Sequence, residues 1–225
     1  MNYFKILIAI ALNCLALSCL AAETQDLWRF KVMVGERQIG THDFRLVSRP
    51  GEQELSSQAS FNVKLLFVNV FDYDHESAER WRANCLQSIE SKTLANRKRF
   101  AVTGKTTDQG FVVSNSSGTV EMPPCVQTFA YWNPAILESR RLLNAQTGEL
   151  EEVDISYTGQ TNFDVGGDSY TAEQYRITLQ AGHIDLWYHT DSNTWLGLET
   201  LSPDNRLVRY IPETTPLTRQ NSSSS

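Results

Sequence analysis

The sequence predicts an all-β, mainly antiparallel fold: a single twisted sheet, closed or nearly closed into a barrel or sandwich, with one short helix near residues 134–143. Short segments of alternating apolar and polar residues recur along most of the chain, and clusters of Gly, Asn, Asp or Pro separate them about every ten residues. One segment, Pro123–Glu149, interrupts this rhythm with prolines, adjacent aromatic residues and paired arginines. We expect that segment to plug or brace the β domain.

Residues 1–21 have the order of a secretory signal peptide. One positive charge, Lys5, precedes a nearly unbroken apolar run, and two small residues, Ala21 and Ala22, follow it. The run is too short to cross a bilayer comfortably, which takes about 20 apolar residues. We therefore expect export to the periplasm. A lipoprotein signal that ends at Cys19 is the alternative, and the residues just before that cysteine fit it poorly.

Residues 22–212 form the expected single domain, because roughly 200 residues suffice for one sizeable core. The chain carries a net charge of −6 and no basic tract, so it is a poor candidate for binding nucleic acid or anionic membranes. No second long apolar run predicts a transmembrane span. Residues 213–225 lose all periodicity and end in four serines, which predicts a disordered tail.

The first half of the domain begins with a predicted hairpin, formed by Leu27–Val34 and Ile39–Ser48 around a short Gly-containing turn. Further strands are expected at Glu54–Val63, Phe71–Trp81, Cys85–Leu94, Arg99–Thr107 and Phe111–Asn115. The apolar stretch Val63–Phe71 leaves two interpretations open: a fully buried strand, or a single turn at a sheet corner.

The short helix is expected to begin after Asn133. Pro134 would occupy the first helical position, where a missing N–H costs nothing, and Asn133 would serve as the cap. Gly148 marks the return to strands. These are expected at Leu150–Tyr157, Ser169–Leu179, His183–His189, Trp195–Leu201 and Arg206–Ile211.

Two cysteines, Cys85 and Cys125, remain once the signal peptide is set aside. An even pair in an oxidising compartment is first interpreted as a disulfide. Two buried free thiols are the alternative, and a metal site is a weak hypothesis without CxxC spacing.

The strings FDYDHESAERW, FAYWNP, LLNAQTG and IDLWY occur in this order, with Cys85 and Cys125 between the first two. In these strings the chain resembles an exported bacterial family described as domain of unknown function six-one-three-four. The resemblance covers roughly Leu27 to Ile211. It implies an export signal and a β-rich, barrel-like domain, and it implies no activity, because that family has no assigned chemistry.

Recognisable catalytic and metal-binding motifs are missing from the sequence. It contains no GxSxG elbow, no HxH or HExxH spacing and no phosphate-binding loop, so we predict no enzyme class, no cofactor and no metal. Asp72, Asp74 and Glu76 share one face of a predicted strand and are oxygen ligands that suit a hard cation. A solvated strand face is the simpler interpretation.

A disulfide between Cys85 and Cys125 would bring the end of FDYDHESAERW close to FAYWNP, and together they would form an aromatic pocket with few polar groups. The candidate ligand-binding residues are His75, Arg80, Tyr131, Trp132, Asn133, Arg141 and Trp187. The alternative is that the aromatic residues fill the end of the barrel and that one of the arginines braces the plug through an acid. Neighbours on a strand point to opposite faces, so only one of Trp187 and Tyr188 can line the interior.

The leading functional hypothesis is a non-enzymatic exported domain that binds an apolar or amphipathic, lipid-like ligand. One alternative is a structural or interaction protein of the cell envelope, with a filled core and a protein partner. A third is a hydrolase or isomerase that uses His75 with Glu76 or Asp74. This last hypothesis is disfavoured because both carboxylates point to the strand face opposite His75.

Overall fold

The computed structural model describes residues 23–65, 68–202 and 205–217 of the 225-residue chain. The expected signal peptide over residues 1–21, and with it the alternative anchor at Cys19, lies outside the described residues. The expected tail is described only in part: the last strand continues to Thr214, Leu217 is buried, and residues 218–225 lie outside.

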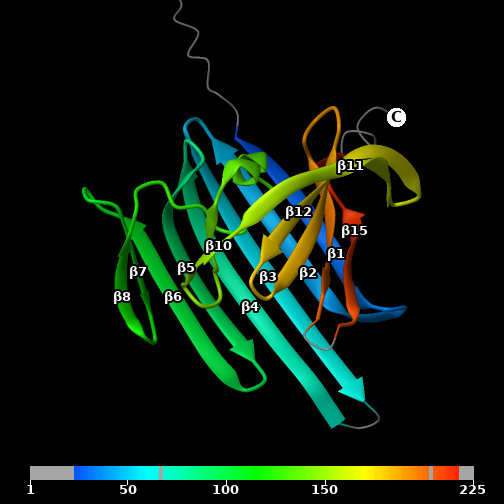
Figure 1. Ribbon diagram of the computed structural model, residues 1–225, viewed down its shortest axis with the longest axis horizontal. Helices are drawn as coiled ribbons and strands as arrows, with labels where there is room; N and C mark the ends of the chain where they lie inside the picture. Colours follow the sequence, from blue (N-terminus) through cyan, green and yellow to red (C-terminus); the bar gives the residue numbers. More distant parts are fainter. Residues whose placement is uncertain (1–22, 66–67, 203–204, 218–225) are drawn as a thin grey trace, which may run out of the picture.

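Thirteen strands form one antiparallel sheet, which confirms the all-β, antiparallel prediction (Figure 1). Its order is β11-β12-β13-β14-β15-β1-β2-β3-β4-β5-β6-β7-β8, so the first and last strands of the chain pair with each other in the middle. The strands of the first half are β1 Thr24–Val34, β2 Arg37–Arg49, β3 Glu52–Leu65, β4 Val68–Arg82, β5 Cys85–Ala95, β6 Lys98–Thr106, β7 Phe111–Asn115 and β8 Gly118–Met122. Those of the second half are β11 Asp154–Val165, β12 Asp168–Leu179, β13 Gly182–His189, β14 Trp195–Leu201 and β15 Leu207–Thr214.

The sheet is not closed, so the prediction of a closed or nearly closed barrel is wrong. Closure would require β8 to pair with β11, and in the described part of the chain each of these edge strands pairs on one side alone. β8 ends at Met122, because Pro123 and Pro124 lack the backbone N–H groups that would continue its ladder. The chain leaves the sheet there and returns at the opposite edge as β11.

The predicted helix over residues 134–143 is also wrong, although its beginning is right. A single 3-10 turn, η1, spans Pro134–Glu138, and the Asn133 side chain caps it by accepting a hydrogen bond from the Ala135 N–H at 3.1 Å. Ser139 is already extended, and Arg141–Leu143 form a short strand, β9, which pairs with β10, Leu150–Glu152. This pairing, together with burial of Leu142 and Leu143, overrides the local helical tendency.

Residues 123–153, which we call the covering segment, lie across one face of the curved sheet, the inner face (Figure 1). The main hydrophobic core lies between them. Trp132 of the covering segment packs edge-on against Trp81 of β4 at 5.7 Å, and Tyr131 packs against Trp195 of β14 at 5.4 Å. The predicted plug therefore exists, and it covers an open sheet rather than the end of a barrel.

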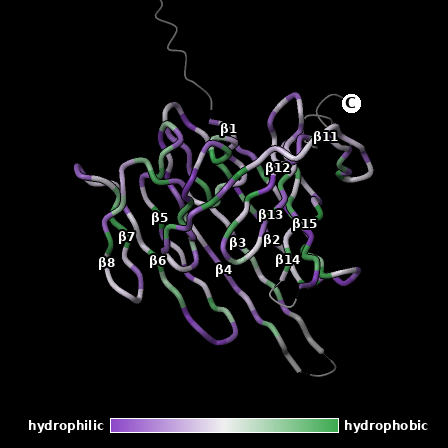
Figure 2. Tube along the Cα trace, in the orientation of Figure 1, coloured by the Kyte–Doolittle hydropathy of each residue, from purple (hydrophilic) through white to green (hydrophobic). Residues whose placement is uncertain are grey.

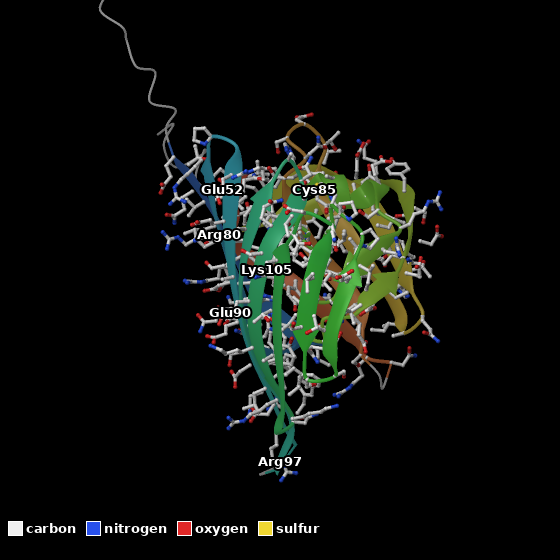
Figure 3. The ribbon with its side chains drawn as sticks, turned by 90° about the vertical axis from the view of Figure 1, so that its left-hand side faces the viewer. Glu52, Arg80, Cys85, Glu90, Arg97 and Lys105 are labelled. Carbon is white, nitrogen blue, oxygen red and sulfur yellow. A yellow bond between two sulfur atoms is a disulfide. The ribbon has the colours of Figure 1, made fainter. Side chains whose placement is uncertain are left out.

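Buried and exposed residues alternate along strands such as β4 and β5, and this sets the two faces of the sheet apart. Figure 2 shows hydrophilic and hydrophobic residues following one another along the strands. On β4, His75, Ser77 and Glu79 are buried, whereas the residues between them are exposed. Arg80 on β4 and Glu90 on β5 point away from the body of the molecule (Figure 3). The inner face thus carries the candidate site, and the outer face carries the charges.

Candidate functional site

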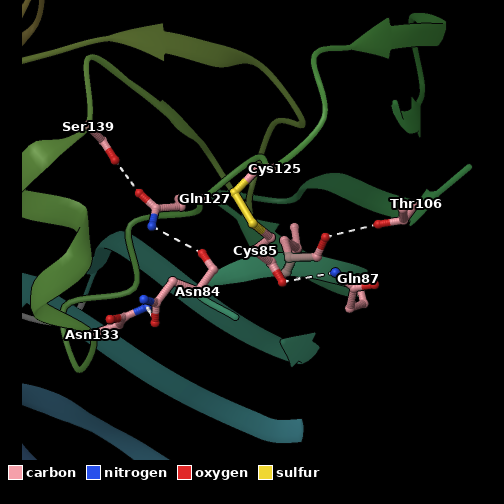
Figure 4. Close-up of a disulfide and its surroundings, with 9 residues drawn as sticks. Asn84, Cys85, Gln87, Thr106, Cys125, Gln127, Asn133 and Ser139 are labelled. Carbon is pink, nitrogen blue, oxygen red and sulfur yellow. Dashed lines mark hydrogen bonds between the residues drawn. A yellow bond between two sulfur atoms is a disulfide. The ribbon is translucent and has the colours of Figure 1, made fainter. Parts of the chain in front are cut away.

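The disulfide between Cys85 and Cys125 is present, which confirms the first interpretation of the cysteine pair (Figure 4). It ties the beginning of β5 to the beginning of the covering segment. Next to it, the Leu86 N–H donates to the Val126 carbonyl at 2.9 Å, and the Gln127 side-chain amide donates to the Asn84 carbonyl at 3.1 Å. These contacts fix the covering segment at one end of the inner face.

The loop LNAQTG fixes the other part of the covering segment. The Asn144 side-chain oxygen accepts from the Gln146 and Thr147 N–H groups at 2.8 and 3.2 Å, which makes a compact turn. The Ser91 hydroxyl of β5 donates to the Ala145 carbonyl, and the Asn115 amide of β7 donates to the Thr147 carbonyl at 2.7 Å. Polar side chains of the inner face therefore hold the backbone of this loop.

A cavity of about 300 Å³ remains between the inner face and the covering segment. Several of its lining residues, among them Tyr73, Phe129 and Ile184, are only half-buried, so the cavity is not sealed from solvent. It is lined by His42, Phe44, Leu55, Ser57, Tyr73, His75, Ser77, Glu79, Leu179, Ile184, Glu151 and residues 128–132 and 144–146.

Three larger hollows, of about 580, 610 and 1000 Å³, are walled by the sheet and its turns, without any residue of the covering segment. Their walls consist mainly of exposed, outward-pointing side chains such as Arg45, Gln58 and Lys92. A binding site typically buries most of a ligand between converging walls. We therefore take the smaller inner cavity, walled by two layers, as the candidate site.

The inner face of the sheet in and beside this cavity carries an unusual number of polar residues for the core of a β protein. We call them the polar row: His42, Ser57, His75, Ser77, Glu79, Ser91 and Thr93, all on the inner face of β2–β5. Its small hydroxyl residues leave space that larger apolar side chains would fill. The polar row thus accounts for both the cavity and its hydrogen-bonding capacity.

His42 and Ser57 form the closest contact in the polar row. The His42 Nε2 atom lies 2.7 Å from the Ser57 Oγ, and its Nδ1 atom lies 3.3 Å from the Tyr210 hydroxyl. Burial, with a smaller contribution from the neighbouring His75, lowers the pKa of His42 to about 3. The imidazole is therefore neutral at physiological pH and acts as a hydrogen-bonding group.

Glu79 is a buried acid whose two described hydrogen-bond donors are both neutral. Its Oε2 accepts from the Trp81 indole N–H at 2.9 Å and from the Thr128 hydroxyl at 3.2 Å. Burial raises the pKa of Glu79 to about 7, although both hydrogen bonds act in the opposite direction. Near neutral pH this carboxyl group therefore exists in both protonation states.

An aromatic wall extends the cavity along β3 and β4. Phe61 and Tyr73 stack at 5.2 Å, and Tyr73 stacks on His75 at 6.2 Å. The His75 Nδ1 atom lies 2.8 Å from the Thr93 hydroxyl, and burial lowers the pKa of His75. Burial raises the pKa of Tyr73 to about 12. All these groups are uncharged at neutral pH.

The structure brings together three of the seven predicted site residues: His75, Tyr131 and Trp132 line the same cavity. Asn133 is buried beside them, where it caps η1 and contacts Asn84. It does not line the inner cavity.

The other three predicted residues lie elsewhere. Arg80 points outward to Glu54, and exposed Arg141 pairs with Glu152. Trp187 belongs to a second buried cluster, where it packs against Phe163 at 5.3 Å. Its neighbour Tyr188 faces the covering segment and donates to the Tyr131 carbonyl at 2.8 Å, so the two do point to opposite faces.

Sequence reasoning missed His42, Ser57 and Glu79. A signal for two of them was present, because alternation places Glu79 on the same face as His75, and His42 on the same face as Phe44. What was missing was the register, which sets His42 and Ser57 close together across β2 and β3.

The described residues contain no cluster of three or more His, Cys, Asp or Glu side chains that could hold a metal ion. The three outward acids of β4 are engaged with neutral or basic neighbours: Asp72 accepts from Asn62, Asp74 from Ser60, and Glu76 lies 3.7 Å from Lys92. In the part of the chain that the structure describes, no helix has the length and apolar character needed to span a membrane.

These features define an all-β domain of a particular class: an open antiparallel sheet whose inner face is covered by a disulfide-tied irregular segment over a partly polar cavity. The chain belongs to the family described as Domain of unknown function (DUF6134), whose model matches residues 30–213. The match confirms the resemblance seen in the sequence strings. Comparison with curated proteins gave no match.

Proposed function

We propose that this protein is a non-enzymatic binding domain that takes up a small amphipathic ligand in the cavity beneath the covering segment. The observation that carries the proposal is the composition of the walls, in which aromatic and aliphatic side chains face a buried row of hydrogen-bonding groups. Ligand pockets typically measure ~300–1000 Å³ and combine apolar walls with a few polar groups. A cavity of about 300 Å³ suits a small molecule, or the end of a longer one, better than a whole diacyl lipid.

An unpaired donor supports the same proposal. The indole N–H of Trp132 is buried and has no hydrogen-bond partner among the described residues. Leaving such a donor unsatisfied costs about 1–3 kcal/mol. Trp132 is one of the residues that line the inner cavity, and we infer that an acceptor group of a bound molecule satisfies this donor.

We further infer that the domain acts after export, in the periplasm. The Cys85–Cys125 disulfide supports this inference, because such bonds persist in oxidising compartments. The n-, h- and c-region order of residues 1–21 supports it independently.

The experiment is native mass spectrometry of the full protein purified from the periplasm without detergent. We expect a population heavier than the polypeptide by the mass of one small organic molecule, which extraction with organic solvent removes. A protein that carries no extra mass after gentle purification, and that binds no member of a library of small amphiphiles, would contradict the proposal.

The 2.7 Å contact between His42 and Ser57 favours a second function, hydrolysis through a serine nucleophile and a histidine base. Two features weigh against it: the lowered pKa of His42 makes it a weak base, and its second ring nitrogen faces a tyrosine hydroxyl rather than a carboxylate. Hydrolysis of a short-chain aryl ester that disappears in Ser57→Ala would establish this function. Equal slow hydrolysis by both proteins would dismiss it.

A third function is that of an envelope interaction protein with a filled core. The large exposed hydrophobic residues that would serve a partner surface are Val120, Tyr157, Leu201, Leu207 and Ile211. Leu201, Leu207 and Ile211 lie on the neighbouring strands β14 and β15, whereas Val120 and Tyr157 lie on the two edge strands, β8 and β11. This function expects a filled core, whereas the structure has an inner cavity that could take a ligand. We therefore favour ligand binding over this third function.

A further inference from the structure

The charges that line the inner cavity are of one sign. Its lining residues include two carboxyl groups, Glu79 and Glu151, and no lysine or arginine. The two histidines that line it, His42 and His75, have lowered pKa values and are neutral at physiological pH. An anionic head group, such as a carboxylate or phosphate, would find no positive partner there.

Among the described residues neither carboxyl group is paired with a cation, and Glu79 is the more deeply buried of the two. Both of its described contacts, Trp81 Nε1 and Thr128 Oγ1, are neutral donors, and none of the ion pairs in the described chain includes it. A buried carboxylate is costly unless a positive group compensates it. The protein itself does not supply that group, and a ligand could.

Aromatic rings surround the same space. The rings of Phe44, Tyr73, Phe129, Tyr131 and Trp132 all line the cavity. An organic cation is attracted to the faces of such rings, most strongly where the contact is shielded from water. Aromatic walls combined with an unpaired acid are a typical composition for recognising an ammonium group.

We propose that the natural ligand is an organic cation, an amine or quaternary ammonium on an apolar body, whose positive group pairs with Glu79 beneath the aromatic rings. This rests on the proposed function, because it assigns a ligand class to the same cavity. It narrows the expected class of ligand from lipid-like amphipathic molecules in general to organic cations.

The test compares three probes of similar size and different charge: 2-phenylethylamine, 2-phenylethanol and phenylacetate. Each is titrated calorimetrically into the full-length mature protein at pH 8, where Glu79 is mostly ionised. We expect the amine to bind about ten-fold or more tightly than the alcohol, a difference that a single desolvated charge contact can supply, and phenylacetate to bind most weakly. Glu79→Gln should reduce the affinity for the amine to that for the alcohol.

Glu76→Gln is the matched control, since Glu76 lies on the same strand, is exposed and points to the outer face. It should leave all three affinities unchanged. Should Glu79→Gln fail to fold, the ranking of the three probes on the wild-type protein decides the question alone.

Failure of this inference is distinguishable from failure of the proposed function. Equal or tighter binding of the alcohol, or a neutral or anionic molecule found in the purified protein, would overturn the cationic ligand and leave the binding function standing. No binding of any probe, with no molecule carried by the purified protein, would overturn both.

Discussion

The two faces of strand β4 are both polar, and they differ in kind. The outer face carries charged residues such as Glu76 and Arg80, which are more than half exposed and pair loosely with neighbours. The inner face carries His75, Ser77 and Glu79, which are buried under the covering segment and hydrogen-bonded or next to hydrogen-bonding groups. A strand with an ordinary core would be apolar on one side, so the inner polarity indicates a site rather than packing alone.

The largest expected effect on the free energy of unfolding distinguishes two adjacent residues at the end of β4. Trp81 is fully buried and packs against Trp132, and removing such a side chain costs about 3–5 kcal/mol. Trp81→Ala should therefore lower the free energy of unfolding by that amount, measured by urea denaturation. Arg80→Ala, one position away on the outer face, should change it by less than about 1 kcal/mol, because exposed ion pairs contribute little.

The second largest effect on stability is expected from removing the disulfide bond. Cys85 and Cys125 are separated by 40 positions, and closing a loop of that length is expected to stabilise the fold by about 4 kcal/mol in the chain-entropy model. The double variant Cys85→Ser/Cys125→Ser should unfold at lower urea concentration. Hydrogen exchange should increase first in residues 126–133 of the covering segment and much less in β12–β13. Hydrogen exchange that increases equally over the whole sheet would contradict the role of the disulfide in holding this segment locally.

The third prediction uses the two glutamates of β4. The raised pKa of Glu79 means that the folded state binds this proton more tightly than the unfolded state. Protonated Glu79 therefore contributes to the free energy of unfolding in full below pH ~4.5, and this contribution is lost as the pH rises through about 7. The total is roughly 3 kcal/mol at most, at 1.36 kcal/mol for each unit of pKa.

The stability of Glu79→Gln relative to wild type should therefore increase by up to that amount between pH 4.5 and pH 8. Urea denaturation at several pH values measures this difference, in which the histidine contributions cancel. The difference in free energy of unfolding between Glu76→Gln and wild type should not change with pH over the same range. A difference between Glu79→Gln and wild type that does not change with pH would show that this carboxyl group is not buried as described.

The smallest expected effect concerns a single hydrogen bond to the covering segment. Tyr188→Phe removes the donor that reaches the Tyr131 carbonyl and should cost about 1–2 kcal/mol, because the carbonyl is left without that partner. Tyr157→Phe on the exposed edge strand β11 is the control and should be neutral within about 0.5 kcal/mol. Thermal denaturation measures both, and equal effects would contradict the account of how the segment is held.

Much of this sheet could be predicted from alternation, because each β-strand exposes successive side chains to different environments. FDYDHESAERW was correctly assigned as a strand with His75 and Asp74 on opposite faces, and Asn133 was correctly assigned as a cap. Closure was not predictable in the same way. It depends on where the chain goes after Pro123 and Pro124, which is decided by packing against residues distant in sequence.

The candidate site was predictable only in part for a related reason. His75, Tyr131 and Trp132 were found because a cysteine pair links their segments. Glu79 and Ser57 were missed, because whether an inward polar residue lines a cavity or a filled core depends on what covers it. Arg80 was included because it ends the strand that precedes Cys85, and Arg141 and Trp187 because of their residue type; the structure places all three elsewhere.

The most direct test of the central claim is whether filling the inner cavity abolishes ligand binding. Ser77 lines that cavity, whereas its neighbour Ala78 lies on the outer face, so Ser77→Phe and Ala78→Phe add similar bulk on opposite sides of one strand. Calorimetric titration with 2-phenylethanol, a neutral probe, should show binding to the wild type and to Ala78→Phe and none to Ser77→Phe, with all three proteins folded. Undiminished binding to Ser77→Phe, or loss confined to Ala78→Phe, would contradict the assignment of the site to the inner face.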